Sequence, residues 1–470
     1  MGRSKTKPKS AETHTRPRPS KRSLFKSPNH LSQREVTYTN KVLFDECKEY
    51  NKVYKAIDFS KSTFLGEGRN GMAVSVKNSP TLKQLLSRTK DYPDLVVKIQ
   101  ELKDIVDVND CTPDISYTIP VQNSPSRLSI TVPKDAKMCK FTSELVLQEN
   151  VINELCDPDQ RYFSVGLFKI FGYKMCNDKI LSFMPKLSGG TLHDCVPLYT
   201  PASRTSIPIS QEQLTFDLFT LVVTSCLLEK SQTMHNDLKP DNIFLDVISP
   251  YEKCISKNII YTPDKKLYKV FYFEIGSGGT TGTGTARGSR IYFESKNLTH
   301  IPKFGDWGMA CSYGKHIYNK QTLNGRFGDY VVNYYSKSSD MLFLMYALFF
   351  GNLSKMMDEN KYGAFLRTMF LKCITAADSN VPINRARTGS RLLYTKQDYV
   401  VLTDTEFEDF IFTITKGTQR IHASNILYID EALGSFPRYF LDTVLETNSN
   451  ELTSIPQGYT ESDCVCIGRI

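Results

Sequence analysis

The chain has 470 residues, of which 40% are hydrophobic and 23% charged, and its formal net charge is +9. This length leaves room for several domains or one large domain with insertions, and the composition excludes a wholly disordered, collagen-like or disulfide-stapled chain. The longest uncharged apolar runs, 218–228 and 341–350, are far shorter than the roughly 20 residues of a membrane-spanning helix, so we expect neither a membrane span nor a secretory signal.

The beginning of the chain is basic and poor in large apolar side chains. Residues 1–30 contain nine Lys and Arg against one acid, Glu12, and we expect residues 1–34 to form a disordered basic arm. Its charge favours an anionic partner, either an anionic membrane surface or nucleic acid. Gly2 and Thr6 fit the N-myristoylation pattern, and one acyl chain supplemented by basic residues anchors a protein to a membrane.

The twelve cysteines are scattered and include no CxxC pair that would suggest a zinc site. Such a distribution is typical of reduced thiols in an intracellular compartment. We therefore expect free cysteines and a cytoplasmic protein, associated with membranes through its acylated arm.

Three glycines, Gly66, Gly68 and Gly71, separate two short apolar runs. Glycines allow a strand turn to lie on a triphosphate with its backbone N–H groups directed at the phosphates, since a Cβ there would obstruct the approach. Further on, Lys98 interrupts the apolar strand expected at 94–99. A lysine in a buried strand needs a partner, and its charge suits phosphate oxygens.

Residues 141–155 have helical spacing, because apolar residues recur every four positions. Glu149 borders the apolar arc of this helix, so we expect Glu149 to hold Lys98 in place, with Glu144 as the second choice.

The next segments alternate between strands and helices. Apolar runs predict strands at 165–173, 180–184 and 243–245, and long helices at 211–230 and 339–350.

A polar loop, His235-Asn-Asp-Leu-Lys-Pro-Asp-Asn242, precedes the strand at 243–245. In it, Asp237 is suited to orient and deprotonate a hydroxyl, Lys239 to neutralise a transferring phosphoryl group, and Asn242 to bind Mg²⁺ through its amide oxygen. Asp306, in a turn closed by Gly308, would supply a carboxylate for a metal that bridges phosphates. Between them, the irregular stretch 247–300 contains a low-complexity run at 276–289 that we expect to be a flexible loop.

Taken together, these residues resemble the catalytic set of the eukaryotic-type protein kinase family, whose motifs are HRDLKPxN and DFG. The resemblance implies an α+β, two-lobed fold with a β-rich small lobe over 55–185 and a helical large lobe over 186–435. The large lobe would carry an insertion at 247–300, and residues 436–470 would follow as a C-terminal tail.

The same resemblance implies ATP and Mg²⁺ as cofactors, with Asn242 and Asp306 as metal ligands. The segment that includes Met184 and Lys186 resembles the hinge between the lobes, where the adenine is held. Asp340 resembles the aspartate at the start of the family's large-lobe αF helix.

The position of Lys239 resembles that in serine/threonine kinases, which implies protein substrates with Ser or Thr acceptors.

Asn236 departs from the family, because it replaces an arginine that often binds a phosphorylated loop. The resemblance then implies a constitutively competent enzyme. Trp307 replaces the usual phenylalanine and should still pack beneath the helix. An Ala-Pro-Glu motif is missing, although Arg420 resembles its usual partner and Asp329 could substitute for the glutamate. The long spacings between motifs resemble those of kinases from large DNA viruses.

Two other functions remain open from the sequence. One is a pseudokinase or scaffold that binds membrane or nucleic acid through its basic arm, and retention of Lys98, Asp237, Asn242 and Asp306 argues against it. The other is a small-molecule phosphotransferase of similar fold, against which Lys239-Pro240 and the glycine-rich loop weigh.

Overall fold

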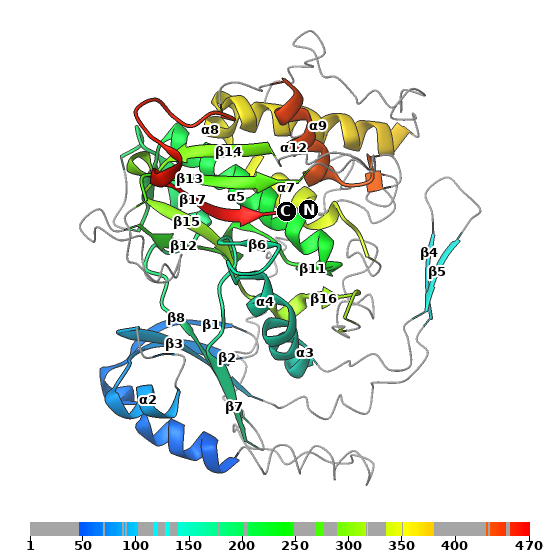
Figure 1. Cartoon of the computed structure of the whole chain (residues 1–470). Coiled ribbons are helices and arrows are strands. Elements are labelled where there is room, and N and C mark those ends of the chain that lie inside the picture. Colours follow the sequence, from blue (N-terminus) through cyan, green and yellow to red (C-terminus); the bar gives the residue numbers. More distant parts are fainter. Residues whose placement is uncertain are drawn as a thin grey trace, which may run out of the picture.

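The computed structural model (Figure 1) has a mixed α+β architecture. It describes residues 47–68, 71–86, 89, 92–101, 116–120, 127–131, 140–176, 179–201, 205–248, 268–276, 289–315, 317, 335–349, 351–379, 429–430, 433–447 and 452–470. The basic arm with Gly2, most of the low-complexity run, Asp329 and Arg420 lie outside the described residues.

One end of the molecule, here called the small part, is built on a five-stranded antiparallel sheet (Figure 1). Its strands, in spatial order, are β1 (Thr63–Gly68), β2 (Gly71–Lys77), β3 (Asp94–Glu101), β8 (Lys179–Pro185) and β7 (Gly172–Cys176). A separate hairpin joins β4 (Ser116–Pro120) to β5 (Arg127–Thr131). The strands expected at 94–99 and 180–184 are confirmed.

The alternation of side chains along β3 gives the sheet two different faces. Leu95 and Val97 are buried on one face, in a core shared with the helix at 47–56 and with α2 (Pro80–Leu85). Lys98, one residue further on, therefore points to the opposite face, toward the helix at 140–155.

A disulfide joins Cys47, at the start of the helix at 47–56, to Cys176, at the end of β7. Beside it, Lys174 donates to Glu49 at 2.7 Å. The expectation that all thiols are reduced is therefore wrong for this pair. No sequence pattern indicated the bond, because the two cysteines are 129 residues apart and come together only when the sheet has folded. Cys156, Cys195, Cys226, Cys311, Cys464 and Cys466 form no disulfide.

The helix expected at 141–155 is continuous but not uniform. It begins as α3 (Lys140–Leu147), passes through one π-helical turn, η4 (Gln148–Ile152), and ends as α4 (Asn153–Leu155). Its distal end is fixed to the chain that follows, since Asn153 both donates to the Ile170 carbonyl and accepts from the Ile170 N–H.

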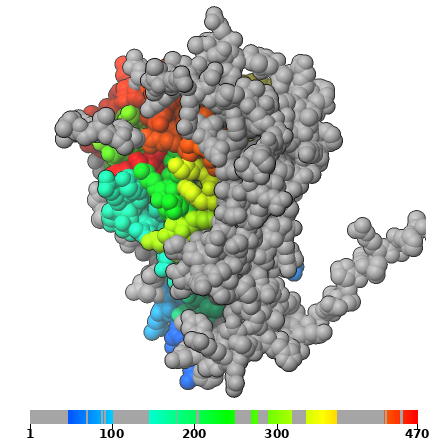
Figure 2. All heavy atoms as spheres, turned by 90° about the vertical axis from the view of Figure 1, so that its right-hand side faces the viewer, coloured from blue at the N-terminus to red at the C-terminus, as the bar shows by residue number. Residues whose placement is uncertain are grey.

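The remainder of the described chain, here called the large part, surrounds α5 (Gln211–Lys230), which is confirmed over its expected length. Buried side chains occur all round α5, which explains its nearly uninterrupted apolar run. The other helices are α7 (Ser339–Phe349), α8 (Ser354–Glu359), α9 (Lys361–Ser379) and α12 (Phe436–Thr447). In the side view (Figure 2), blue atoms of the small part lie at the bottom and red and orange C-terminal residues at the top, so the two parts are stacked end to end.

Short strands and turns of the large part build the site. Two antiparallel pairs join β11 (Thr233–Met234) to β16 (Cys311–Ser312) and β12 (Ile243–Val247) to β15 (His300–Phe304). A parallel pair joins β9 (Cys195–Pro197) to β10 (Ile207–Ile209). The 3-10 turns of the large part are η5 (Leu192–Asp194), η6 (Pro240–Asn242), η7 (Ser295–Asn297), η8 (Trp307–Met309) and η11 (Glu461–Asp463), and a further one, η1 (Phe59–Lys61), belongs to the small part.

A four-stranded sheet combines segments from three distant parts of the chain. Its order is β14 (Ser289–Glu294), β13 (Val270–Ile275), β17 (Cys464–Arg469) and β6 (Phe163–Ser164). An aromatic cluster packs it onto α5, with Phe216 contacting Phe271, Phe273 and Phe293. Within the stretch 247–300, β13 and β14 are thus regular strands that contribute to the core, and the expected C-terminal tail 436–470 supplies α12 and β17, which pack into the same core.

The expected strand at 165–173 is wrong over most of its length. Its backbone is occupied by other partners: the buried Lys303 donates to the carbonyls of Val165 and Leu167, and the Phe304 N–H donates to Gly166. A buried run can thus satisfy its polar groups without joining a ladder. Among the described helices, none combines the length and apolar character that crossing a bilayer requires.

Candidate functional site

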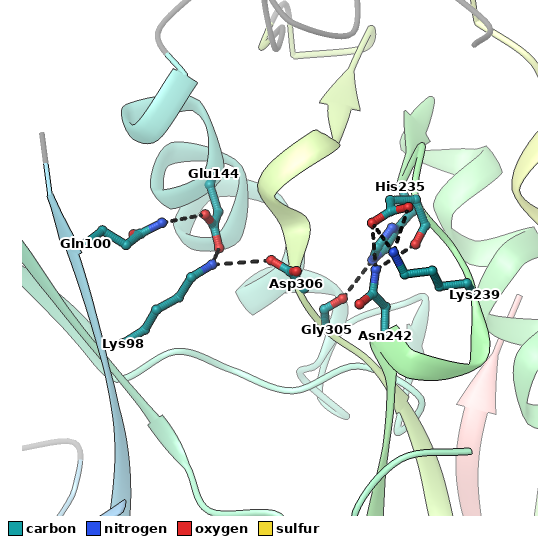
Figure 3. A network of polar contacts seen from close by, with 9 residues as sticks. Lys98, Gln100, Glu144, His235, Lys239, Asn242, Gly305 and Asp306 are labelled. Carbon is teal, nitrogen blue, oxygen red and sulfur yellow. Dashed lines mark hydrogen bonds and ion pairs between the residues drawn. The ribbon is translucent and has the colours of Figure 1, made fainter. Parts of the chain in front are cut away.

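The site lies where β3, α3 and the turn after β15 meet, and Lys98 is at its centre (Figure 3). Lys98 Nζ donates to Glu144 Oε1 at 2.7 Å and to Asp306 Oδ1 at 3.3 Å. Burial alone lowers the pKa of Lys98, but the Glu144 and Asp306 carboxylates raise it by more, so the net pKa lies above the ordinary range. The ammonium group is therefore charged near neutral pH and is shared between a helix and a turn.

The partner of Lys98 is Glu144, and the expectation of Glu149 is wrong. Glu144 lies three residues before Leu147 and seven before Val151, so it falls on the buried stripe of the helix. Glu149 is two residues after Leu147, off that stripe, and it is exposed. The apolar arc was identified correctly, but the choice of the glutamate at its edge was not.

Gln100 is part of this group, and the sequence reasoning missed it. Its Nε2 donates to Glu144 Oε2 at 3.2 Å (Figure 3). The signal was present in the sequence, because Gln100 is a polar residue two positions after Lys98 and so lies on the same face of the strand.

The second group belongs to the loop between β11 and β12. Lys239 Nζ donates to both carboxylate oxygens of Asp237, at 3.2 and 3.0 Å. Asn242 Nδ2 donates to the Asp237 carbonyl at 2.7 Å and to its Oδ2 at 3.0 Å. Both bonds use the amide nitrogen, so the amide oxygen of Asn242 remains to serve as a ligand, and in Figure 3 it points toward the side where Asp306 lies.

The start of this loop is held by Asp340, near the beginning of α7. The Asp340 carboxylate accepts the backbone N–H of His235 at 2.6 Å and of Asn236 at 2.8 Å. Burial raises the pKa of Asp340, and His235 and these N–H bonds offset part of the rise. Asn236 has a left-handed backbone with φ of 63°, a conformation that asparagine tolerates better than most residues. Its amide then donates to the Met309 carbonyl at 3.2 Å.

The pairing of β12 with β15 brings the loop and the turn together. Ile243 pairs with Phe304, and the next residue, Gly305, donates its N–H to the Asn242 carbonyl at 2.9 Å. The buried His235 donates from Nε2 to the Gly305 carbonyl at 2.8 Å, which ties the loop to the turn. Trp307 is buried in η8 beside α3, as expected.

Asp306 takes a left-handed conformation, with φ of 57°, and its side chain is 51% exposed. Partial burial of Asp306 raises its pKa, but the charges of Lys98 and then His235 lower it by more, so the net pKa lies below the usual range. An exposed, ionised carboxylate beside an ammonium group is suited to share that space with a divalent cation and with anionic oxygens.

The three glycines differ in what they contribute. A Cβ on Gly71 would lie 2.1 Å from the Ile99 carbonyl oxygen, and its φ is +153°, so strand pairing itself requires glycine there. A Cβ on Gly66 would meet no described atom within 4 Å, which leaves room over β1 for a ligand. Gly68 pairs with Gly71 at the end of the hairpin.

Met184 and Lys186 lie at the end of β8, where Met184 pairs with Val96 of β3. Neither residue belongs to the network of Figure 3. The chain that follows is tied to the large part, because the Gly189 N–H donates to the Leu245 carbonyl and the Leu245 N–H to the Gly190 carbonyl.

The described part of the chain contains no cluster of three or more His, Cys, Asp or Glu that could hold a metal alone. Thus Asp306 and Asn242 would hold a cation only together with oxygens from a ligand or water, which is how Mg²⁺ is usually bound beside phosphates. No protein-family model matches the chain, and no curated protein matches it.

Proposed function

We propose that the protein is a two-lobed, ATP- and Mg²⁺-dependent protein serine/threonine kinase. The observation that carries the proposal is the position of Lys98, whose ammonium is 2.7 Å from Glu144 and 3.3 Å from Asp306. A cation fixed between a helix carboxylate and a metal-binding carboxylate is suited to bind the phosphates of a nucleotide.

The proposed fold has the small part as one lobe and the large part as the other. The small part supplies the glycine hairpin and Lys98, and the large part supplies Asp237, Asn242 and Asp306. Adenine would lie near Met184 and Lys186, where β8 leads into the large part, and the phosphates would lie beside β1, where Gly66 leaves room. Mg²⁺ held by Asn242 and Asp306 would neutralise charge on the phosphate oxygens.

In the proposed reaction, Asp237 accepts a hydrogen bond from the substrate hydroxyl and takes its proton as the oxygen attacks the γ-phosphorus. The bond from that phosphorus to the β-phosphate oxygen breaks, and ADP leaves. Lys239, which is bonded to Asp237, would neutralise charge on the transferred group. Lys239 also favours Ser or Thr of protein substrates over small-molecule acceptors, and the presence of Lys98, Asp237, Asn242 and Asp306 argues against a pseudokinase.

The N-terminal arm suggests where the enzyme works. Its basic residues and Gly2 support a cytoplasmic enzyme held at an anionic membrane surface, with nucleic acid as the less favoured partner. A virus-infected host cell is the setting that the viral resemblance supports.

The test is phosphate transfer from labelled ATP to generic protein substrates in the presence of Mg²⁺. We expect Asp306→Asn to lower kcat by at least about a hundredfold, because a neutral amide replaces the metal-binding carboxylate. Asp241→Asn is the matched control, since Asp241 is an exposed residue of the same loop with no role in the proposed reaction, and it should stay within about twofold of the unsubstituted protein. Absence of transfer by the unsubstituted protein, or equal rates for both variants, would reject the proposal.

A further inference from the structure

Gln100 and Lys98 hold the same carboxylate from the same strand. Lys98 takes Glu144 Oε1 at 2.7 Å, and Gln100 takes Glu144 Oε2 at 3.2 Å (Figure 3). Two donors, one on each oxygen, fix the rotation of the carboxylate as well as its position. With Lys98 alone, the carboxylate could turn about its own axis and still keep one bond.

The burial of Gln100 indicates that this bond matters. Its side chain is 1% exposed, and within the described part of the chain its Oε1 has no hydrogen-bond partner. A buried, unpaired acceptor is destabilising, so an apolar side chain would suit the stability of the sheet better. The benefit of an amide at this position therefore lies at its other end, in the bond to Glu144.

The helix that carries Glu144 gives the bond a mechanical role. Its distal end is fixed by the two bonds between Asn153 and Ile170, and the π turn Gln148–Ile152 separates that end from Glu144. Such turns are local departures from regular helix that often occur at functional sites. The Glu144 end of the helix is thus held by the bonds of Glu144 to β3 and by the packing of α3 on η8, in addition to the bonds at the distal end.

We propose that Gln100 is a positioning residue: by donating to Oε2 it keeps Oε1 of Glu144 on Lys98, and so keeps the Lys98 ammonium beside Asp306. The consequence for rate rests on the proposed kinase function. The consequence for Lys98 itself does not, because it follows from the two bonds to Glu144 alone.

The first test is activity. Gln100→Leu removes the donor and keeps much of the volume, and we expect kcat/KM for ATP to fall about tenfold to a hundredfold, as for a misplaced catalytic group. Val97→Ala is the matched control: Val97 lies on the same strand but in the opposite core, so the variant loses stability without touching Glu144. Its kcat/KM per folded molecule should stay within about twofold of the unsubstituted protein.

A pH profile separates positioning from general damage. In Gln100→Glu, the new carboxyl lies in a buried site against Glu144, and the nearby Lys98 charge is already balanced by Glu144 and Asp306. Burial and the Glu144 carboxylate therefore raise the pKa of the new carboxyl above the usual value of about 4.3. Below that pKa it is neutral and its O–H donates to Glu144 Oε2 in place of the amide; above it, two carboxylates repel. Activity of this variant, relative to the unsubstituted protein, should therefore fall as pH rises, and Gln100→Leu should show no such trend. A flat ratio for Gln100→Glu would contradict the positioning role.

A readout without catalysis distinguishes this inference from the proposed function. The rate at which acetic anhydride modifies Lys98, followed by mass spectrometry at pH 8.5, reports how firmly its carboxylate partners hold the proton. We expect faster modification in Gln100→Leu and no change in Val97→Ala. Faster modification in a protein that transfers no phosphate would keep the role of Gln100 and reject the kinase; an unchanged rate would overturn the role of Gln100 whatever the activity.

Discussion

The two halves of the candidate site are assembled from very different distances along the chain. In the loop half, Asp237 contacts Lys239 and Asn242, which lie two and five residues away. In the lysine half, Lys98 contacts Glu144 and Asp306, which lie 46 and 208 residues away. The pairings within the loop half are local, and Asp340 of α7 holds only the start of the loop, whereas every pairing of the lysine half requires β3, α3 and η8 to be packed together. Packing changes should therefore affect the lysine half first.

The largest effect is expected in the loop half, from Asp237→Asn. The variant keeps the shape of the loop but cannot accept the substrate proton, so kcat should fall about 10²- to 10⁴-fold. Binding of a fluorescent ATP analogue should remain within about threefold, because Asp237 is not a ligand of the nucleotide in the proposed mechanism. Activity equal to that of the unsubstituted protein would remove Asp237 from the reaction.

The matched pair Glu144→Gln and Glu149→Gln tests the lysine half. Glu144→Gln replaces the charge that holds Lys98, and we expect kcat/KM to fall about tenfold to a hundredfold. Glu149→Gln changes an exposed residue and should leave kcat/KM unchanged within about twofold. If the two variants were reversed in effect, the pairing in Figure 3 would not be the functional one.

The same contrast explains what could be predicted from the sequence. Asp237, Lys239 and Asn242 were singled out from their spacing within one loop; the bonds of Lys239 and Asn242 to Asp237 were not foreseen, and the roles of the three residues stay predictions. Asp306 and Lys98 were also identified, since each is a charged residue in or next to an apolar run. The choice between Glu144 and Glu149 failed because it depends on the rotation of α3 against β3, which apolar spacing fixes only to within an arc.

The fold divides in the same way. Helix α5 and strands β3 and β8 follow from local pattern and were predicted. The four-stranded sheet was not, because it pairs β13 with β17 across almost 200 residues and no local signal encodes such a partner. The strand expected at 165–173 failed for a related reason: Lys303, far along the sequence, takes its carbonyl oxygens.

A smaller effect is expected at Asn236, which joins the loop half to η8 through the Met309 carbonyl. Asn236→Gly tolerates the left-handed backbone but removes the amide, so it isolates the contribution of the side chain. We expect kcat to fall about threefold to tenfold, since one neutral hydrogen bond contributes about 0.5–1.5 kcal/mol.

The control for Asn236 is phosphatase treatment of the unsubstituted protein. If the amide bond holds the turn without a phosphorylated loop, treatment should leave the rate unchanged. A rate that collapses on dephosphorylation would show that a phosphate, and not Asn236, holds the turn.

The smallest effect on activity, and a clear one on stability, is expected at Asp430. Burial raises the pKa of Asp430 to about 6, despite bonds from Ser336 and Ser338 just before α7. Because the folded state binds the proton more tightly than the unfolded state, this group stabilises the fold at low pH, and the contribution is lost as pH rises from about 4 through about 6. A shift from 3.8 to about 6 corresponds to about 3 kcal/mol.

Asp430→Asn mimics the protonated acid and removes this dependence. The variant should equal the unsubstituted protein in unfolding free energy near pH 4 and exceed it by up to about 3 kcal/mol at pH 7.5, as measured by urea denaturation. Its kcat should be nearly unchanged, because Asp430 acts on residues 336–338. This segment, just before α7, supports the loop half without contacting Asp237. A variant that is less stable at pH 7.5 would mean that Asp430 is ionised in the fold and holds Ser336 and Ser338 by charge. In that case the loop half would depend on long-range packing as much as the lysine half does.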